Sequence, residues 1–263
     1  MKKTPIFLFY CFLFPIFLLA QESSTLQNIK NSNLLKVCIW TEYYGISYLD
    51  ERTQQLKGID SDLAVELAKD LKVELEFVSS SFVTFIEDLT QHKCDIAMFA
   101  IGDTPERKKH VRFTTPHLQS DIYAIASKLN PRIKKWEDID QKGVVVSVAK
   151  GTYHEPVMQE KLQHATLFIA KNMQKRQLEV EAGRADVFMT DFPFAKRMLE
   201  KTLWAKLITP SSTYHLTPYA WAITYGDDEF YTQIEAFILR IKKDGRLLKA
   251  AKNNGLEPIV QLN

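Results

Sequence analysis

The chain has 263 residues, in which 34 Lys+Arg nearly balance 32 Asp+Glu, with 46% hydrophobic residues, 9 Gly, 10 Pro and 3 Cys. This length suffices for two lobes, because single hydrophobic cores rarely grow beyond roughly 250–300 residues. The apolar content excludes a disordered chain, and three cysteines are too few for a disulfide scaffold. The balanced charge, without a basic cluster interleaved with aromatics, gives no reason to expect nucleic acid as a partner.

Residues 1–20 are typical of a secretory signal peptide. Two lysines precede an apolar run at residues 6–19, which is too short for a comfortable membrane span and ends at Ala20 before a polar stretch. We therefore expect cleavage near Ala20 and a mature protein outside the cytoplasm, with an uncleaved anchor as the alternative because the run is unusually rich in Phe. The polar residues 21–33 predict a flexible leader.

The first half of the mature chain alternates strand and helix patterns. The expected elements are, in order, a strand at 35–40, a helix opened by 58–62 and running to Leu71, a strand at 73–78, a helix at 82–91 and a strand at 95–100. This β-α-β-α-β order predicts a parallel sheet with right-handed crossovers.

The same pattern recurs in the second half, with strands at 143–148, 166–170 and 187–190 and helices near 154–163 and 173–182. Strand candidates at 120–126 and 219–224 lie between the two patterns, and a helical segment at 228–251, broken at Asp244-Gly245, is expected to pack on the first lobe. We predict one lobe from 34–119 with 213–263 and another from 120–212. Ligands of such sheets bind beyond the carboxyl ends of the strands, so the expected site is the cleft between the lobes.

The third predicted strand leads into a candidate anion site. Thr104 is a good helix N-cap and Pro105 suits the first helical position, so Arg107 falls in the first turn of a short helix. An anion bound there would contact both the free amides and the guanidinium, whose planar shape suits a carboxylate. The alternative is a solvated arginine in the basic run 107–109.

The second lobe offers a complementary set of groups. A Gly-containing turn either places the hydroxyl of Thr152 where it could close over the same anion or simply caps the next helix. Asp191 follows a strand and is either the N-cap of the next helix or a carboxylate for a cationic ligand group. Tyr43, Tyr44 and Phe82 are either core residues or aromatic walls. Combined, these groups are complementary to a zwitterion, of which an α-amino acid is the simplest.

Cysteine and histidine spacing limits the chemistry. Cys38 and Cys94 lie at the edges of predicted strands and could form a disulfide in an oxidising compartment or remain separate buried thiols. The six histidines show no metal-ligand spacing and no nucleophile with a base is visible, so we expect no metal, no cofactor and no catalytic residue.

Several motifs together resemble the family 3 extracellular solute-binding proteins, the periplasmic polar amino-acid receptors of ABC importers. They are the G-I-D-S-D-L-A segment at 58–64, T-P-E-R-K at 104–108 followed by F-T-T-P at 113–116, K-G-T at 150–152, and G-R-A-D-V at 183–187 leading to Asp191. The resemblance covers residues 34–254. It implies an α/β, two-lobed periplasmic binding protein fold of type II, with mixed, mostly parallel sheets flanked by helices and a two-strand hinge. It also implies a binding protein, not an enzyme, that delivers a small carboxylated ligand to an ABC permease; we expect a monomer.

The resemblance assigns roles residue by residue. Arg107 matches the arginine that clamps the ligand carboxylate, and Tyr153 holds the place of the residue whose backbone amide assists. Asp191 matches the acid that receives the α-amino group. Tyr43 and Phe82 match the aromatic positions that enclose the ligand side chain.

The chain also departs from the family pattern. Gly102 stands where a Ser or Thr usually helps to bind the carboxylate; losing that hydroxyl removes about 0.5–1.5 kcal/mol, although the amide can still donate. Ala100, two residues earlier, often has a Gly or Ser counterpart that contacts the ligand through its backbone. Glu42 and Asp103, if they face the cleft, would favour a ligand with extra cationic or donor groups.

Two other functions remain open at this stage. An enzyme on the same scaffold, for example a dehydratase or lyase, could draw acid and base groups from Glu42, Asp103, His154 and Asp191. A ligand-sensing receptor would need the same cleft as a transport protein, so the sequence does not separate the two.

Overall fold

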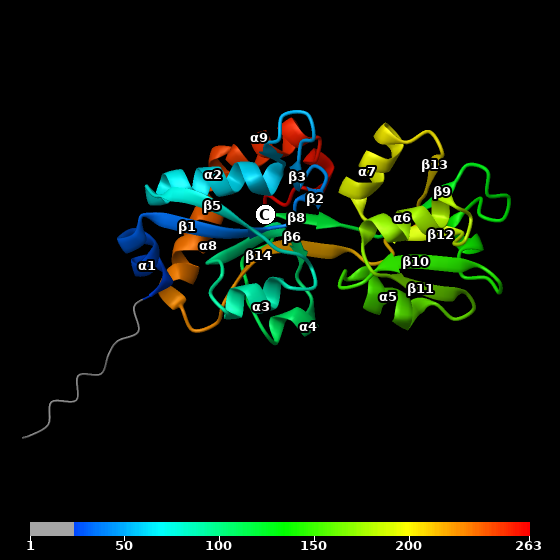
Figure 1. Ribbon diagram of the computed structural model, residues 1–263, viewed down its shortest axis with the longest axis horizontal. Coiled ribbons are helices and arrows are strands. Elements are labelled where there is room, and N and C mark those ends of the chain that lie inside the picture. Colours follow the sequence, from blue (N-terminus) through cyan, green and yellow to red (C-terminus); the bar gives the residue numbers. More distant parts are fainter. Residues whose placement is uncertain (1–23) are drawn as a thin grey trace, which may run out of the picture.

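The structure, a computed structural model, describes residues 24–263 and has two large β-sheets side by side with helices around them (Figure 1). The expected signal peptide, residues 1–20, lies outside the described residues. Among residues 24–263, no helix combines the length and the apolar character that a membrane span requires. The α/β architecture with two helix-flanked sheets confirms the expected fold class.

Most of the described part of the expected flexible leader at 21–33 is helical, which corrects that expectation for residues 25–32. Helix α1 (Thr25–Ser32) is capped by the hydroxyl of Ser24. Leu26 and Ile29 lie one turn apart on the same face and are buried. Their burial offsets the entropy cost of ordering a polar segment, a gain that depends on tertiary contact and is not visible in composition.

The first sheet has the strand order β5-β1-β6-β14-β7, and β8 pairs with β14. β1 is parallel to β5 and β6, whereas β14 is antiparallel to β6, β7 and β8. Figure 1 shows α2 and α9 on one side of this sheet and α3 and α4 on the other. The elements are β1 (Leu34–Ile39), α2 (Ile59–Leu71), β5 (Glu74–Ser79), α3 (Phe85–Thr90), β6 (Ile96–Gly102), α4 (Pro105–Lys108), β7 (Arg112–Phe113), β8 (Leu118–Ser120), β14 (Thr217–Ile223), α8 (Asp228–Asp244), α9 (Arg246–Asn254) and a 3-10 turn at Glu257–Ile259.

The second sheet has the order β11-β10-β12-β9-β13, with β10 parallel to β11 and β12, and β9 antiparallel to β12 and β13. Its elements are β9 (Tyr123–Ser127), a 3-10 turn at Trp136–Asp138, β10 (Val145–Ala149), α5 (His154–Lys161), β11 (Thr166–Ala170), α6 (Met173–Glu181), β12 (Val187–Thr190), α7 (Phe192–Lys201) and β13 (Ala205–Ile208). The strands and helices expected in both halves are confirmed, with small shifts at their ends. A helix after Asp191, here α7, was expected only as one of two alternatives, and β13 was not expected.

A small antiparallel sheet of β2 (Glu42–Tyr43), β3 (Ser47–Leu49) and β4 (Leu56–Lys57) was not expected, because strands of two or three residues show no readable alternation. Gly58 joins this sheet to α2 with φ +123°, and a Cβ there would lie 2.3 Å from the carbonyl oxygen of Ile46. Only glycine permits this close backbone contact. The glycine of the 58–64 motif therefore fixes the hairpin that carries Tyr43.

The chain passes between the two sheets twice, through residues 121–122 and 209–216. The carboxylate of Asp121 joins these segments, since it accepts hydrogen bonds from the backbone nitrogens of Tyr214 (2.9 Å) and His215 (2.7 Å). This matches the expected two-strand hinge. The sheets are thus connected by two short segments that one side chain holds together.

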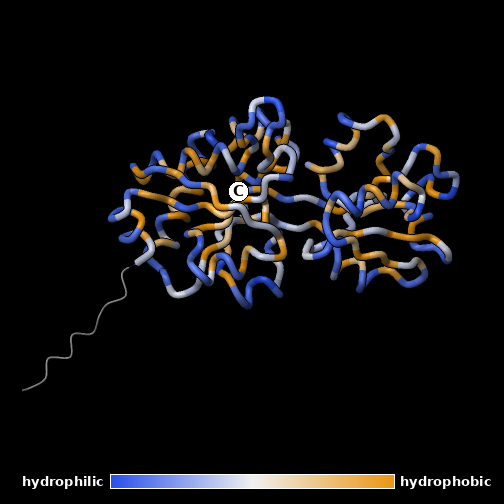
Figure 2. Tube along the Cα trace, in the orientation of Figure 1, coloured by the Kyte–Doolittle hydropathy of each residue, from blue (hydrophilic) through white to orange (hydrophobic). Residues whose placement is uncertain are grey.

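Figure 2 shows hydrophobic residues concentrated along the strands of the two large sheets, whereas many loop segments are hydrophilic. Every residue of β6 and β12 is buried, as expected for central strands covered on both faces. Cys38 and Cys94 form a disulfide that links β1 to the turn before β6, which decides between the two alternatives that the sequence left open. A bridge of this kind typically contributes about 2–4 kcal/mol to stability.

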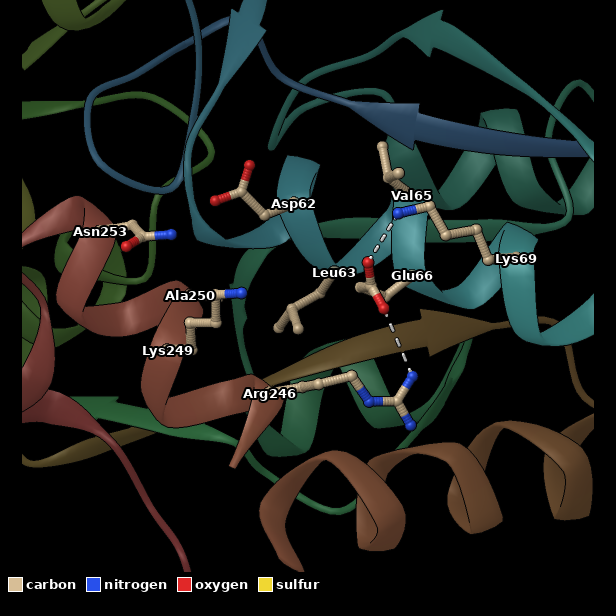
Figure 3. Close-up of a pocket in the computed structure, with 9 residues that line it drawn as sticks. All are labelled: Asp62, Leu63, Val65, Glu66, Lys69, Arg246, Lys249, Ala250 and Asn253. Atoms are coloured by element: carbon tan, nitrogen blue, oxygen red, sulfur yellow. Dashed lines mark hydrogen bonds and ion pairs between the residues drawn. The ribbon is translucent and has the colours of Figure 1, made fainter. Parts of the chain in front are cut away.

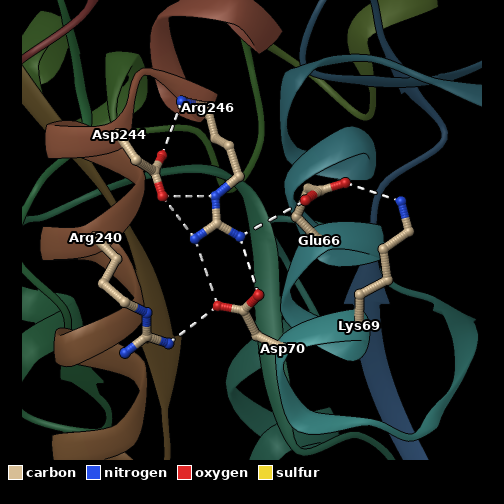
Figure 4. A network of polar contacts seen from close by, with 6 residues as sticks. All are labelled: Glu66, Lys69, Asp70, Arg240, Asp244 and Arg246. Carbon is tan, nitrogen blue, oxygen red and sulfur yellow. Dashed lines mark hydrogen bonds and ion pairs between the residues drawn. The ribbon is translucent and has the colours of Figure 1, made fainter.

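A surface network of charges ties α2 to α8 and α9 (Figure 4). Asp70 of α2 pairs with Arg246 at 3.0 Å and with Arg240 at 3.1 Å. Arg246 also pairs with Asp244 at 2.9 Å and with Glu66 at 3.6 Å. Burial by itself would raise the pKa of Asp70, but the hydrogen bonds from the two arginines outweigh it and lower the pKa.

We predict that Asp70→Asn lowers the free energy of unfolding by roughly 0.5–1 kcal/mol at pH 7, the size typical of a partly exposed ion-pair network. Because the folded-state pKa is lowered, the wild-type advantage is complete above the ordinary carboxyl pKa and is lost as the pH falls through the lowered value. Urea unfolding over a pH series measures this difference. Asp228→Asn, which breaks a single exposed pair with Arg112, is the control with an effect near zero. An Asp70 effect that persists in acid would contradict the electrostatic explanation.

Candidate functional site

Arg107 lies at the junction between the two sheets. Thr104 caps α4 by accepting a hydrogen bond from the Arg107 nitrogen, as the sequence predicted. The guanidinium is buried: Nη1 donates to the Gly102 carbonyl at the end of β6 (2.9 Å), and Nη2 donates to the Gly151 carbonyl after β10 (3.0 Å). The alternative of a solvated arginine is therefore wrong. Burial lowers its pKa to about 10, so it stays charged at neutral pH.

Aromatic rings surround this guanidinium on the side of the first sheet. The rings of Phe82 and Phe85 each have their centroid 5.5 Å from Arg107 Cζ. The Phe82 ring also lies 5.9 Å from that of Tyr43 and 5.3 Å from that of Trp40. The two expected aromatic positions, Tyr43 and Phe82, therefore stand next to each other beside Arg107.

Asp191 lies on the other side of the junction and is the N-cap of the next helix, one of the two roles that the sequence allowed. Its Oδ1 accepts a hydrogen bond from Phe194 N (3.3 Å) and so caps α7. Its Oδ2 accepts from the hydroxyl of Tyr43 on β2 and from that of Tyr219 on β14 (2.7 Å). Burial raises the pKa of Asp191, partly offset by the hydrogen bonds from the two tyrosines.

Tyr153 and His154 complete the buried polar cluster. The hydroxyl of Tyr153 lies 3.2 Å from that of Tyr219. Its ring stacks on the imidazole of His154, with centroids 4.1 Å apart. Burial, reinforced by the charge of Arg176, holds the pKa of His154 well below its usual value, so this histidine is neutral at pH 7.

Other sequence candidates have different partners. The hydroxyl of Thr152 donates to the Ala149 carbonyl (2.7 Å), so it closes a turn. Ala100 donates its backbone N–H to Asp60 (2.6 Å). Asp103 pairs with Lys108 at 2.8 Å. Glu42 is exposed, and it does not join the cluster around Asp191.

Several hollows in the described part of the chain lie outside this cluster, and two of them concern residues named above. Glu42 and Tyr44 line a cavity of about 440 Å³ whose far wall is formed by Gln174, Gln177 and Arg197 of α6 and α7. A second pocket, of about 340 Å³, lies between α2 and α9 (Figure 3). Its charged side chains largely pair with each other, since Glu66 contacts both Lys69 and Arg246.

Sequence reasoning missed Tyr219 and Arg176, both fully buried. Tyr219 lies in a strand that was predicted, but no pattern showed which way its side chain points. Arg176 follows Met173 by three residues and precedes Val180 by four, so it shares the buried face of α6. The sequence signal that could have revealed Arg176 is a charged residue at a helix position that faces inward.

The space at Gly102 explains the departure from the family pattern. A Cβ there would lie 3.2 Å from Arg107 Nη1, 3.2 Å from Thr217 Cγ2 and 3.3 Å from Tyr153 Cδ1. The ring of Tyr153 thus occupies the region that a Ser or Thr side chain would need. Gly102 allows the two sheets to approach each other at Arg107.

We predict that Gly102→Ala weakens this approach, because the methyl group meets Arg107, Thr217 and Tyr153 at distances tighter than ordinary contacts. The expected result is a larger radius of gyration in solution scattering and a lower melting temperature. Gly143→Ala controls for the loss of a glycine, since a Cβ there meets nothing within 4 Å, although its φ of +85° adds local strain. An unchanged radius of gyration for the Gly102 variant would contradict the role proposed for this glycine.

Comparison with known proteins gives consistent results. The chain is 28% identical to the cyclohexadienyl dehydratase of Pseudomonas aeruginosa over 244 residues, covering 91% of this chain and 88% of that protein. It is 26% identical to the ABC transporter arginine-binding protein 1 of Escherichia coli over 198 residues, covering 74% of this chain and 80% of that protein.

Solved structures show the same relationship. The crystal structure of the ancestral amino-acid-binding protein AncCDT-1, described as a precursor of cyclohexadienyl dehydratase, matches with 33% identity and a TM-score of 0.80, covering 88% of this chain and 99% of that one. The model of the bacterial extracellular solute-binding proteins, family 3, matches residues 35–255. With its two sheets, double crossing and matching motifs, the chain belongs to the bacterial extracellular solute-binding proteins of family 3.

Proposed function

We propose that this protein is a periplasmic solute-binding protein that captures a small carboxylated, amino-acid-like ligand between its lobes and delivers it to an ABC permease. The observation that carries this proposal is the pair of buried, opposite charges at the junction, Arg107 and Asp191. The lobes are residues 34–119 with 213–263 and residues 120–212. Residues 1–20 direct export, and the mature chain works as a monomer.

The contacts of Arg107 support a carboxylate clamp. Its two Nη groups already donate to two carbonyl oxygens, at 2.9 and 3.0 Å, in the forked arrangement that suits a carboxylate. A ligand carboxylate would take the place of one or both carbonyls. The backbone amides of Gly102 and Tyr153 are close in sequence to these two carbonyls and would assist. Thr152 holds the turn before Tyr153, and the hydrogen bond from Ala100 to Asp60 holds the strand before Gly102.

The contacts of Asp191 support an ammonium site. Its Oδ2 accepts from Tyr43 and Tyr219, which approach from elements far away in the sequence. A ligand ammonium would donate to the same carboxylate, while Tyr43 and Phe82 form an apolar wall for the rest of the ligand. Glu42 stands apart from these groups and lines the neighbouring cavity.

Closure of the lobes follows from the same contacts. The Tyr43–Asp191 and Arg107–Gly151 hydrogen bonds both bridge the proposed lobes. A ligand that binds both charged groups favours the closed arrangement over an open one, and the hinge at Asp121 allows the change. The relatives named for arginine and cystine binding support an amino-acid ligand.

A second candidate function is enzymatic, and the similarity to a cyclohexadienyl dehydratase favours it. His154 is neutral and buried beside Tyr153, but the expected acid–base partners Asp103 and Glu42 have other surroundings. Mass spectrometry of the bound ligand after incubation separates the two functions, because an enzyme would return a changed compound.

We predict that Arg107→Ala weakens ligand binding about 100-fold or more, the loss expected when one partner of a buried, hydrogen-bonded charge pair is removed. Calorimetric titration with the amino acid found in a screen of the standard set measures the change. Lys109→Ala, an exposed lysine two residues away that pairs with Glu106, should leave binding unaltered. Retained affinity in the Arg107 variant would refute the clamp.

A further inference from the structure

Arg176 is a second buried arginine close to Asp191. Its side chain is 0% exposed, and Nη1 donates to the Met189 carbonyl (2.8 Å). The guanidinium lies between two rings, with Cζ 4.5 Å from the centroid of Phe188 and 4.6 Å from that of Phe194. Within residues 24–263, its Nε and Nη2 have no hydrogen-bond partner.

Other unpaired groups lie around this guanidinium. Ser147 of β10 is in register with Phe188 of β12, and Thr190 lies two residues beyond Phe188, so all three side chains project from the same face of the sheet. Arg176 stacks on Phe188 and therefore covers that face. In the described part of the chain, the hydroxyls of Ser147 and Thr190 also lack partners. The set consists of groups that can all donate a hydrogen bond.

His154 adds a further group to this set. Neither ring nitrogen makes a hydrogen bond of normal geometry among residues 24–263, although the Thr190 backbone and the charge of Arg176 both influence its pKa. Burying polar groups without partners is costly, and each one in a native protein calls for an explanation. An anion would satisfy donors of this kind together.

The balance of buried charges points the same way. Two arginines are buried among the described residues, Arg107 and Arg176. The buried acids other than Asp191 already have partners, namely Asp60 with His117, Asp88 with Lys93, Glu179 with Arg184, and Asp186 with Arg132. The two buried arginines thus outnumber the one buried carboxylate that has no ion-pair partner, that of Asp191, which leaves one buried positive charge without a counter-charge.

We infer that the ligand carries a second acidic group, which Arg176 receives together with Ser147, Thr190 and His154. This rests on the proposed function: Arg107 binds the α-carboxylate and Asp191 the ammonium, while the side-chain acid supplies the missing negative charge. The ligand is thus an amino acid with an acidic side chain. A cationic side chain, such as that of arginine, would be repelled by Arg176.

The test compares acids with their amides, which have nearly the same shape. Calorimetric titration of the mature chain with L-glutamate, L-glutamine, L-aspartate, L-asparagine and L-arginine should give at least about tenfold tighter binding for an acid than for its amide, as charge-assisted hydrogen bonds predict. Equal or tighter binding of an amide or of arginine would overturn this inference and leave the proposed function standing. If no amino acid and no other small carboxylate binds in a wider screen, the proposed function itself fails.

Substitution of Arg176 tests whether this residue causes the preference for the acid over its amide. Arg176→Met keeps much of the side-chain volume and removes the charge, so the ratio of acid to amide affinity should fall close to one. Arg184→Met, at an exposed arginine of the same lobe, is the control that should keep the wild-type ratio. Melting curves show whether each variant folds. If Arg176→Met does not fold, Arg176→Lys replaces it: this variant keeps the positive charge but loses the two-pronged guanidinium, so the ratio of acid to amide affinity should be intermediate. An unchanged ratio in a folded Arg176 variant would overturn the assignment.

Discussion

The site depends on one buried guanidinium. Arg107 donates to carbonyls at the carboxyl ends of strands in both sheets, so a single side chain spans their junction. Removing such an ion from water costs several kcal/mol, which charge-assisted hydrogen bonds and the rings of Phe82 and Phe85 offset. The close approach that these bonds need is possible because Gly102 and Gly151 carry no Cβ; one at Gly151 would lie 2.7 Å from Val83.

A second buried charge supports the strand end that meets Arg107. Asp60 accepts hydrogen bonds from the backbone of Ala100 (2.6 Å) and from the indole of Trp221 (2.9 Å), and it lies 2.9 Å from a ring nitrogen of His117. Ala100 has φ +48°, a left-handed conformation that costs roughly 1–2 kcal/mol for a residue with a Cβ. The bond to Asp60 helps to hold this conformation and so sets the path of the chain to Gly102.

The distribution of buried charge bears on the choice of ligand. Two arginines and the carboxylate of Asp191 are buried at the junction and in the second lobe, whereas the acidic candidates Glu42 and Asp103 are exposed or paired elsewhere. A neutral His154 adds no charge of its own at pH 7. Electrostatics of this kind act mainly on specificity, since a ligand of the wrong sign leaves a buried charge unpaired. The relatives share the fold, and the side chains behind Asp191 are where selectivity can differ.

The sequence by itself determined the elements and their caps, because periodicity, N-caps and turn glycines depend on neighbours a few residues away. Thr104 and Pro105 correctly predicted α4, and Asp191 was correctly placed before α7 as a possible cap. Only the tertiary structure decided that α1 is ordered, that Glu42 lies apart, and that Arg176 stands behind Asp191. The Tyr43–Asp191 contact joins residues 148 positions apart. Such contacts depend on how the two lobes approach each other, and no pattern of neighbouring residues in the sequence encodes that approach.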